Sequence, residues 1–172
     1  MQENKDFEQS SGIEKRKIEV ARDRLLELST VHLAVNSAEK TPEMGVSPFI
    51  RRKDGLYIYT SHLSQHVRDL IRQRTAACML CADEVNSQNI WARNRLKFTV
   101  DVIEINRDEL NFVEICDDFA NAHGPTMGLI RDFTDFHMFK LIPISGVLVI
   151  GFAKAFTVSG SNFEIVAHIS KV

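Results

Sequence analysis

The chain has 172 residues, of which 44% are hydrophobic, so it is long enough to bury one sizeable core. Its 21 lysines and arginines nearly balance its 23 aspartates and glutamates, and the formal net charge of -2 gives no reason to expect nucleic acid or an anionic membrane as a partner. No apolar run reaches the length of a membrane span, and the polar N-terminus lacks the hydrophobic region of a secretory signal. We therefore expect one cytoplasmic domain over residues 13–172, preceded by a flexible polar segment over residues 1–12.

The three cysteines agree with a reducing compartment, since they are an odd number without the spacing of a disulfide framework. Cys78 and Cys81 have C-x-x-C spacing, but they lie in an apolar run that predicts a strand. Residues three apart on a strand point to opposite faces, so these two thiols could not share a metal or form a redox pair. We expect them, and Cys116, to be ordinary core residues.

Apolar residues that recur among charges predict four helices. The helices are expected at residues 13–28, 63–73, 108–122 and 127–133.

Short apolar or alternating runs between turn signals predict a strand-rich chain. The runs lie at residues 30–36, 44–50, 56–60, 75–82, 96–105, 136–142, 146–150, 153–158 and 163–169. Pro48 is compatible with a strand only at an edge or a bulge, Asp54-Gly55 predicts a hairpin turn, and Pro143 to Gly146 is expected to separate two strands. Six or seven antiparallel strands with peripheral helices indicate a mainly β domain, either a small barrel or a sandwich.

The candidate binding region is residues 56–82, in which an aromatic strand, a polar turn, a short amphipathic helix and an apolar strand follow one another. A donor-rich junction between strand and helix can present a helix start to an anionic ligand. The hydroxyls of Thr60, Ser61 and Ser64 could hold a phosphate there, although the same residue types are ordinary helix caps.

The helix of this region carries two pairs of residues spaced by four. His62 and His66 would share one face if the helix begins at His62, and Arg68 and Arg72 have the same spacing. For both pairs the alternative is a solvated helix surface without a ligand role.

Later in the chain, Asp135 and His137 alternate onto one face of a predicted strand and could form a carboxylate–imidazole pair, either structural or functional. Four aromatic residues are expected to be core side chains, although a flat cofactor could also use them as walls. They are Trp91, Phe133, Phe136 and Phe139.

The order of these motifs resembles the FMN-binding split barrel of the pyridoxamine 5'-phosphate oxidase superfamily. The motifs are the strand at residues 46–49, the Asp54-Gly55 hairpin, the strand at residues 57–61, and Ser64-x-x-x-Arg68-x-Leu70 before an apolar strand. Within this superfamily residues 60–70 are similar to the haem-utilisation (HugZ-like) branch, and residues 92–98, 135–141 and 151–160 extend a likeness that covers roughly residues 25–170.

The resemblance implies a split barrel with an N-terminal helix and two to three further helices, and a homodimer with ligand clefts at its interface. In flavin-binding relatives a lysine commonly holds the phosphate at the position that is His66 here, as in the haem branch. That branch degrades or binds haem through a C-terminal histidine as axial ligand, with a carboxylate that matches Asp135. The last eight residues contain one histidine, His168. It lies before the position at which the resemblance places the axial histidine, and it is the candidate iron ligand of this chain.

Haem requires an axial donor, a partner that fixes the donor's imidazole, and cations for two propionates. The candidate donors are His62, His66 and His168, and Asp135 is the candidate partner and catalytic carboxylate. The candidate cations are Arg68, Arg93, Arg95 and Lys154.

Three functions therefore remain open. The favoured one is a haem-utilisation protein that binds haem and could open the ring oxidatively, with oxygen and a reductant, to release iron. The second is an FMN-dependent oxidoreductase with the flavin phosphate at residues 60–68, and the third is a ligand-free dimeric scaffold.

Overall fold

The computed structural model describes residues 12–169, which form four α-helices, eight β-strands and two short 3-10 helices. The helices are α2 (Gly12–Leu26), α3 (Gln65–Gln73), α4 (Phe112–His123) and α5 (Thr126–Ile130), with η1 (Glu84–Asn86) and η2 (Ile90–Ala92). The strands are β1 (Thr30–Asn36), β2 (Pro42–Arg52), β3 (Gly55–Ser61), β4 (Thr75–Cys81), β5 (Arg95–Ile105), β6 (Phe136–Val149), β7 (Ala155–Ser159) and β8 (Glu164–His168). The predicted flexible segment lies outside the described residues, except for Gly12, which begins α2.

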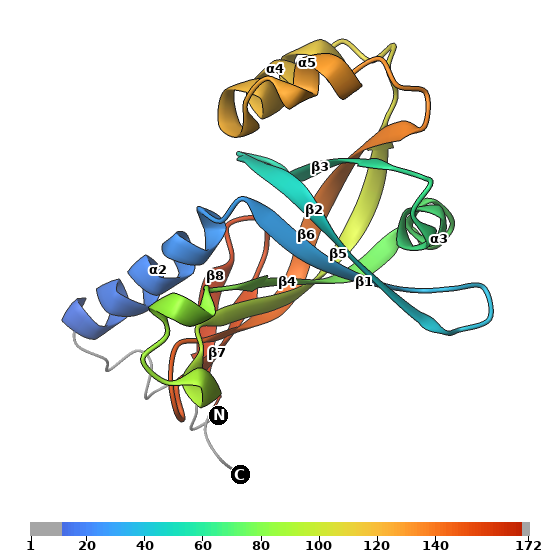
Figure 1. Ribbon diagram of the computed structural model, residues 1–172. Coiled ribbons are helices and arrows are strands. Elements are labelled where there is room, and N and C mark those ends of the chain that lie inside the picture. The colour runs from blue at the N-terminus through green and yellow to red at the C-terminus, as the bar shows by residue number, and fades with distance from the viewer. Residues whose placement is uncertain (1–11, 170–172) are drawn as a thin grey trace. The chain divides into compact units, whose positions relative to one another are not determined.

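The strands form one sheet in the order β3-β2-β1-β4-β5-β6-β7-β8, and β3 also pairs with β6. This extra pairing closes β1 to β6 into a six-stranded barrel, to which β7 and β8 are added as two further strands (Figure 1). The mainly β fold class and the barrel are therefore confirmed. The part of the chain that the structure describes contains no helix long and apolar enough to cross a membrane.

The chain divides into two compact units. The first, here called the barrel unit, consists of residues 29–78 and 100–142, and the second, here called the terminal unit, of residues 12–28, 79–99 and 143–169. Strands β4, β5 and β6 contribute residues to both. The pairing that closes the barrel and the helices α3, α4 and α5 belong to the barrel unit.

Strand β3 has no exposed face from Gly55 to Tyr59, which explains its continuous apolar run. It pairs with β2 on one side and with β6 on the other. Tyr57 and Tyr59 belong to a cluster that includes Ile115 and Phe119 of α4, so this helix covers one face of the strand. A strand buried on both faces requires apolar residues at successive positions rather than in alternation.

In the terminal unit, α2 buries Ile18, Leu25 and Leu26, as the spacing of its apolar residues predicts. The guanidinium of Arg22 donates to the carbonyl of Phe163 at 3.4 Å. The ring of Phe163 meets that of Phe98 edge to face, with centroids 4.8 Å apart, and both rings are buried.

The predicted break between two strands at Pro143 to Gly146 is wrong, because β6 runs without interruption for 14 residues. Pro48 lies at the end of the β1 ladder, opposite Thr30, and the β3 ladder begins at the next residue, Phe49. Proline has no amide hydrogen, and this is tolerated at the point where β2 changes from one partner strand to the other. The prediction that Pro48 requires an edge strand or a bulge is therefore not met.

The prediction of core cysteines is confirmed for Cys78 and Cys116, which are buried. Cys78 is buried, whereas Cys81 is half-buried on the other face of β4, and all three cysteines are free. Burial raises the pKa of the Cys78 thiol to about 12, which makes it unreactive.

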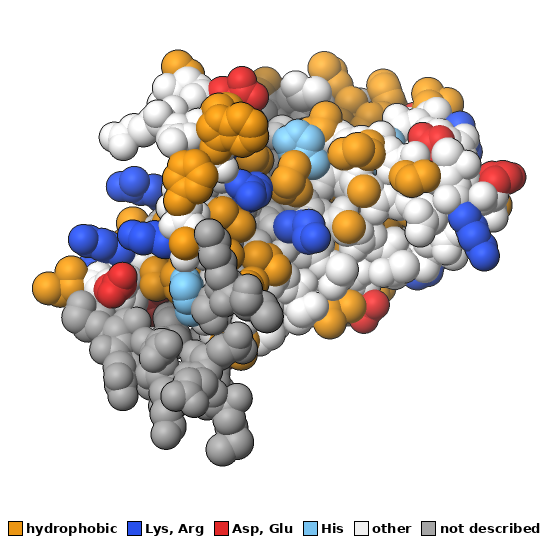
Figure 2. Space-filling view, turned by 90° about the horizontal axis from the view of Figure 1, so that it is seen from below, with side chains coloured by type: hydrophobic (Ala, Val, Ile, Leu, Met, Phe, Trp, Pro, Cys, Tyr) orange, Lys and Arg blue, Asp and Glu red, His pale blue; other side chains and the backbone are white. Residues whose placement is uncertain are grey.

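The aromatic prediction is partly wrong. Phe139 is fully buried and Phe136 is partly buried, but Trp91 is 81% exposed and Phe133 is 50% exposed. They belong to a larger set of exposed hydrophobic side chains, and Figure 2 shows one face on which such side chains lie among arginines and lysines.

Gly146 is required where β6 passes β5. A Cβ there would lie 2.4 Å from the carbonyl oxygen of Lys97 and 2.8 Å from Cβ of Phe98, and the backbone cannot withdraw without breaking the ladder. We expect Gly146→Ala to lower the free energy of unfolding by about 1–3 kcal/mol, the usual cost of overpacking, in urea denaturation.

Gly128→Ala is the matched control, because nothing lies within 4 Å of a Cβ on this residue of α5. It should leave stability unchanged or raise it by up to about 1 kcal/mol, since alanine favours the helix. Equal stability of the two variants would contradict the assigned approach of β6 to β5.

Candidate functional site

The end of β3 and the start of α3 form a corner that is tied to the segment before β6. His62 donates its backbone N–H to the carbonyl of Asp135 at 2.9 Å. The Ser61 hydroxyl donates to the Asp135 carboxylate and accepts the backbone N–H of Leu63 at 3.1 Å. Because the β3–β6 register pairs Ser61 with Phe136, the ladder itself brings Asp135 to this corner.

Arg68 closes the same turn from within α3. Its Nη1 donates to the carbonyls of His62 and Leu63, both at 2.7 Å, and its Nη2 donates to Oε1 of Gln65 at 2.6 Å. The guanidinium is thus engaged by the protein's own acceptors. Ser64 is the N-cap of α3, but its hydroxyl makes no capping hydrogen bond, so the predicted cap role of this hydroxyl is wrong.

His66 is buried against β2, with only 9% of its surface exposed. Its ring lies over Gly45, where a Cβ would come within 2.2 Å of Cε1 and Nε2, and Nε2 has no hydrogen-bond partner among residues 12–169. Burial lowers the pKa of His66, and the nearby Glu43 carboxylate only partly opposes this. His66 is therefore an uncharged core residue at neutral pH.

The predicted common face of His62 and His66 is wrong. The helix begins at Gln65, so His62 belongs to the turn before it and the spacing of four has no helical meaning. His62 is half-buried and faces His137 instead of His66.

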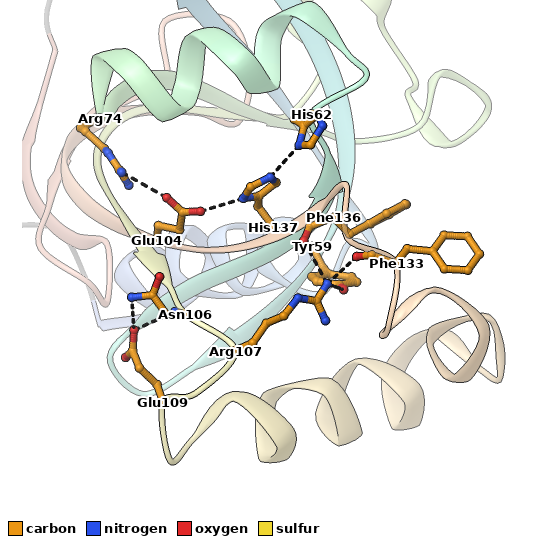
Figure 3. A network of polar contacts seen from close by, with 10 residues as sticks. All are labelled: Tyr59, His62, Arg74, Glu104, Asn106, Arg107, Glu109, Phe133, Phe136 and His137. Atoms are coloured by element: carbon orange, nitrogen blue, oxygen red, sulfur yellow. Dashed lines mark hydrogen bonds and ion pairs between the residues drawn. The ribbon is translucent and has the colours of Figure 1, made fainter.

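A chain of hydrogen bonds within the barrel unit begins at His62 (Figure 3). Nδ1 of His62 lies 2.8 Å from Nε2 of His137, and Nδ1 of His137 lies 2.7 Å from Oε1 of Glu104. Arg74 donates from Nη2 to Oε2 of Glu104 at 3.1 Å. We call these four residues the His62–Arg74 relay.

Backbone pairing places the members of the relay. Thr60 lies opposite His137 in the β3–β6 ladder, which brings the following turn beside His137. β5 also neighbours β6 in the sheet and carries Glu104. Arg74 is the C-cap of α3, and its carbonyl accepts the Val102 N–H of β5 at 2.9 Å.

Asp135 and His137 do not form the predicted pair. The Asp135 carboxylate takes the Ser61 hydroxyl, and the carboxylate partner of His137 is Glu104. The alternation of a strand does not extend to Asp135, because β6 begins at Phe136 and Asp135 lies in the turn before it.

Arg107 fixes the segment that leads to Asp135 (Figure 3). It donates to the carbonyls of Arg131, Phe133 and Phe136 and to the Tyr59 hydroxyl, the last at 3.0 Å. The Tyr59 hydroxyl in turn donates to the Arg131 carbonyl at 2.9 Å. Burial raises the pKa of Tyr59, and Arg107 only partly opposes this, so the hydroxyl stays a donor.

Neither Glu104 nor Arg107 was predicted from the sequence to take part in the site. A signal for Glu104 existed, because it continues the inward alternation of Leu96, Phe98, Val100 and Val102 along β5. A carboxylate at an inward position requires a partner. Arg107 follows the strand directly and has no comparable pattern.

The remaining predicted residues lie in the terminal unit. Arg93 donates to the Ala82 carbonyl and forms a 2.9 Å ion pair with Glu84, and Arg95 donates to the Arg93 carbonyl at 3.0 Å. Lys154 is exposed. Arg93 also lines a polar hollow of about 380 Å³ together with Asn86, Ser87, Gln88, Asn89 and Asn94, among others.

His168 ends β8 and is half-buried. Its Nε2 lies 2.9 Å from the Ala153 carbonyl, and its ring lies 5.0 Å from that of Phe156. A carbonyl can only accept, so Nε2 carries the hydrogen and Nδ1 retains the lone pair.

The predicted site residues thus divide between the two units. The barrel unit brings together Thr60, Ser61, His62, Ser64, His66, Arg68 and Asp135, whereas the terminal unit holds Arg93, Arg95, Lys154 and His168. Among residues 12–169 no group of three histidine, cysteine, aspartate or glutamate side chains could hold a metal ion. An iron ion that is already bound by a porphyrin needs only one or two protein ligands, and single histidines of this chain could provide them.

Comparison with known proteins identifies relatives across most of the chain. No family model matches. Haem oxygenase HutZ of Vibrio cholerae is 27% identical over 145 residues, which are 84% of this chain and 82% of HutZ.

Solved structures share the fold. ChuZ of Campylobacter jejuni has a TM-score of 0.79 and 29% identity, over 94% of this chain and 63% of ChuZ. A crystal structure of Vibrio cholerae HutZ, described there as a haem storage protein, has a TM-score of 0.70 and 24% identity, over 73% of this chain and 89% of HutZ. A putative pyridoxamine 5'-phosphate oxidase from Listeria innocua shares the fold at a TM-score of 0.56 and 14% identity, over 76% of this chain and 97% of that one.

The burial of His66 predicts a specific pH dependence of stability. Its folded-state pKa is lowered, so on acidification the unfolded chain binds a proton more readily than the folded one. Stability should be full above the ordinary histidine pKa of about 6.5 and fall as the pH drops through it, until the lowered folded-state pKa is passed.

Urea denaturation across this range, compared with His66→Gln, measures the effect. The Gln variant lacks the titrating group, so its free energy of unfolding should fall less steeply below about pH 6.5. Parallel curves for the two proteins would show that His66 is not buried as described.

Proposed function

We propose that this chain, a member of the haem-utilisation branch of the pyridoxamine 5'-phosphate oxidase-like split barrels, binds haem at the corner between β3 and α3. One observation favours haem over flavin there. Arg68 is turned onto backbone carbonyls, and His66 is buried and neutral where flavin-binding relatives carry a lysine. A dianionic phosphate requires free cations close by, and neither Arg68 nor His66 provides one at this corner.

The corner suits a flat, mostly apolar ligand. Leu63 is 74% exposed beside His62, and Phe133 is 50% exposed on the segment that leads to Asp135. The Ser61–Asp135 hydrogen bond joins these two segments. Bound haem would supply the iron chemistry, whereas the protein would bind and orient it.

Roles for individual residues are proposed within each unit by itself, from the atoms that are left free there. Nδ1 of His168 has its lone pair available, which supports this residue as an iron donor. Lys154 is exposed and suits a propionate, whereas Arg93 and Arg95 would first have to leave their carbonyl partners. Thr60 and Ser64 line the corner, and Asp135 serves as its fixed hydrogen-bond acceptor, held by Ser61.

A second copy of the chain is the proposed partner. On β2 the outward side chains Met44 and Val46 are 65% and 56% exposed, and they lie opposite Ala34 and His32 of β1. Neighbouring apolar side chains on a sheet face are typical of an interface. The three free cysteines agree with a reducing compartment, and we propose the cytoplasm.

The relatives support two uses of bound haem. HutZ is named a haem oxygenase, and its crystal structure is described as that of a haem storage protein. We propose degradation, with oxygen and an external reductant as co-substrates, because the corner contains the Asp135 carboxylate, which can move protons.

Titration with hemin tests binding. The purified protein should shift the Soret band at about one hemin per chain, and His168→Ala should weaken binding by at least about tenfold if it removes an iron donor. FMN should produce no thermal shift. An unshifted Soret band, or flavin in the purified protein, would overturn the proposal.

The same complex distinguishes degradation from storage. With ascorbate and oxygen the Soret band should decay and iron should become available to a chelator. A band that persists under these conditions would leave haem binding in place and contradict the oxygenase activity.

Light scattering tests the homodimer. The wild-type chain should have twice the mass of one chain, and Val46→Arg should halve it, because a buried arginine without a partner is costly. Val113→Arg is the matched control, since Val113 is similarly exposed at 54% but lies on α4. A monomeric wild type, or a dimeric Val46→Arg variant, would contradict the proposed interface.

A further inference from the structure

The direction of the hydrogen bonds in the His62–Arg74 relay can be assigned from its acidic end. Oε2 of Glu104 accepts from the guanidinium of Arg74 at 3.1 Å, as a carboxylate oxygen in an ion pair does. A carboxylate only accepts, so the 2.7 Å contact of Oε1 requires a hydrogen on Nδ1 of His137.

The next contact follows from the first. A neutral His137 with its hydrogen on Nδ1 has a lone pair on Nε2. The 2.8 Å contact to His62 is then a hydrogen bond donated by Nδ1–H of His62. The lone pair of His62 consequently lies on Nε2, which makes no hydrogen bond within the described part of the chain.

His62 is also fixed in position. Its backbone N–H is bound to the Asp135 carbonyl and its own carbonyl accepts from Arg68. Its partner His137 stacks on Phe139 at 6.0 Å with an interplanar angle of 19°. The backbone and the ring of His62 are therefore both held in place, and its ring faces that of His137 (Figure 3). A hydrogen bond that only stabilised the fold would not require Nε2 of His62 to remain free.

A histidine that ligates a metal typically donates its other ring N–H to a carboxylate, carbonyl or water, which fixes the ring and raises its basicity. The relay provides this arrangement through a second imidazole. We infer that Glu104 and His137 are positioning residues that hold His62 in its Nδ1–H tautomer, so that Nε2 of His62 would be free to act as a nitrogen donor to the iron of bound haem. The identity of the ligand rests on the proposed function, but the tautomer does not.

The tautomer can be measured without any ligand. ¹⁵N-detected NMR of the six histidines, at about pH 8.5 so that ordinary imidazoles are neutral, should show His62 protonated at Nδ1 and unprotonated at Nε2. His62→Gln assigns the signal. Glu104→Gln should shift His62 toward the Nε2–H form, because an amide can donate to His137 and reverse the chain. An Nε2–H tautomer of His62 in the wild type would overturn the inference.

Two porphyrins test the donor role. Glu104→Gln should weaken hemin binding by about 10–100-fold, and His62→Ala by at least as much, whereas both should bind metal-free protoporphyrin like the wild type. Glu114→Gln is the matched control, because it removes a carboxylate that pairs with Arg52 outside the relay. If Glu104→Gln does not fold by circular dichroism, His137→Phe replaces it with the same expected result.

The possible failures are distinguishable. If the wild type does not bind hemin, the proposed function and the donor role both fail, and the NMR result still decides the tautomer. If the wild type binds hemin and the Glu104→Gln and His62→Ala variants bind it as tightly as Glu114→Gln, the donor role alone is overturned. Equal losses for hemin and metal-free protoporphyrin would show that His62 contributes packing and not an iron bond.

Discussion

The pairing of β3 with β6 is the constraint on which the rest of the structure depends. β3 already pairs with β2, and its second ladder, from Leu56 opposite Leu141 to Ser61 opposite Phe136, closes the barrel. The register also decides the local chemistry. A shift by one residue would turn the side chains of β3 to the opposite face and separate Ser61 from Asp135.

Polar groups at the corner are satisfied mainly by backbone carbonyls. Arg68 closes the turn before α3, and Arg107 holds the segment before β6 through three carbonyls and the Tyr59 hydroxyl. Both arginines shape the site without offering a free charge. A turn and an irregular segment expose carbonyls that no strand or helix satisfies, and a guanidinium with five donors can bind several at once.

The two histidines of this region show how differently one residue type is used within a single turn of chain. His66 packs flat over Gly45 and is kept uncharged by burial, so it contributes to the core. His62 stands at the half-exposed end of a relay whose other members lie on β5, β6 and the end of α3. The difference is made by the helix start at Gln65, which separates the two rings.

The sequence by itself determined most of the elements and the mainly β class. Strand β1 was predicted to the residue, the barrel was implied by the family resemblance that the motif order carries, and the corner from Thr60 to Arg68 is joined to Asp135. These features are local, because they depend on alternation, turn residues and the order of segments. The sequence could not determine that Arg68 is engaged, that His66 is buried, or that Glu104, 33 residues before His137, is its partner. Such contacts arise when strands distant in the chain become neighbours in a barrel, so only the tertiary structure decided them.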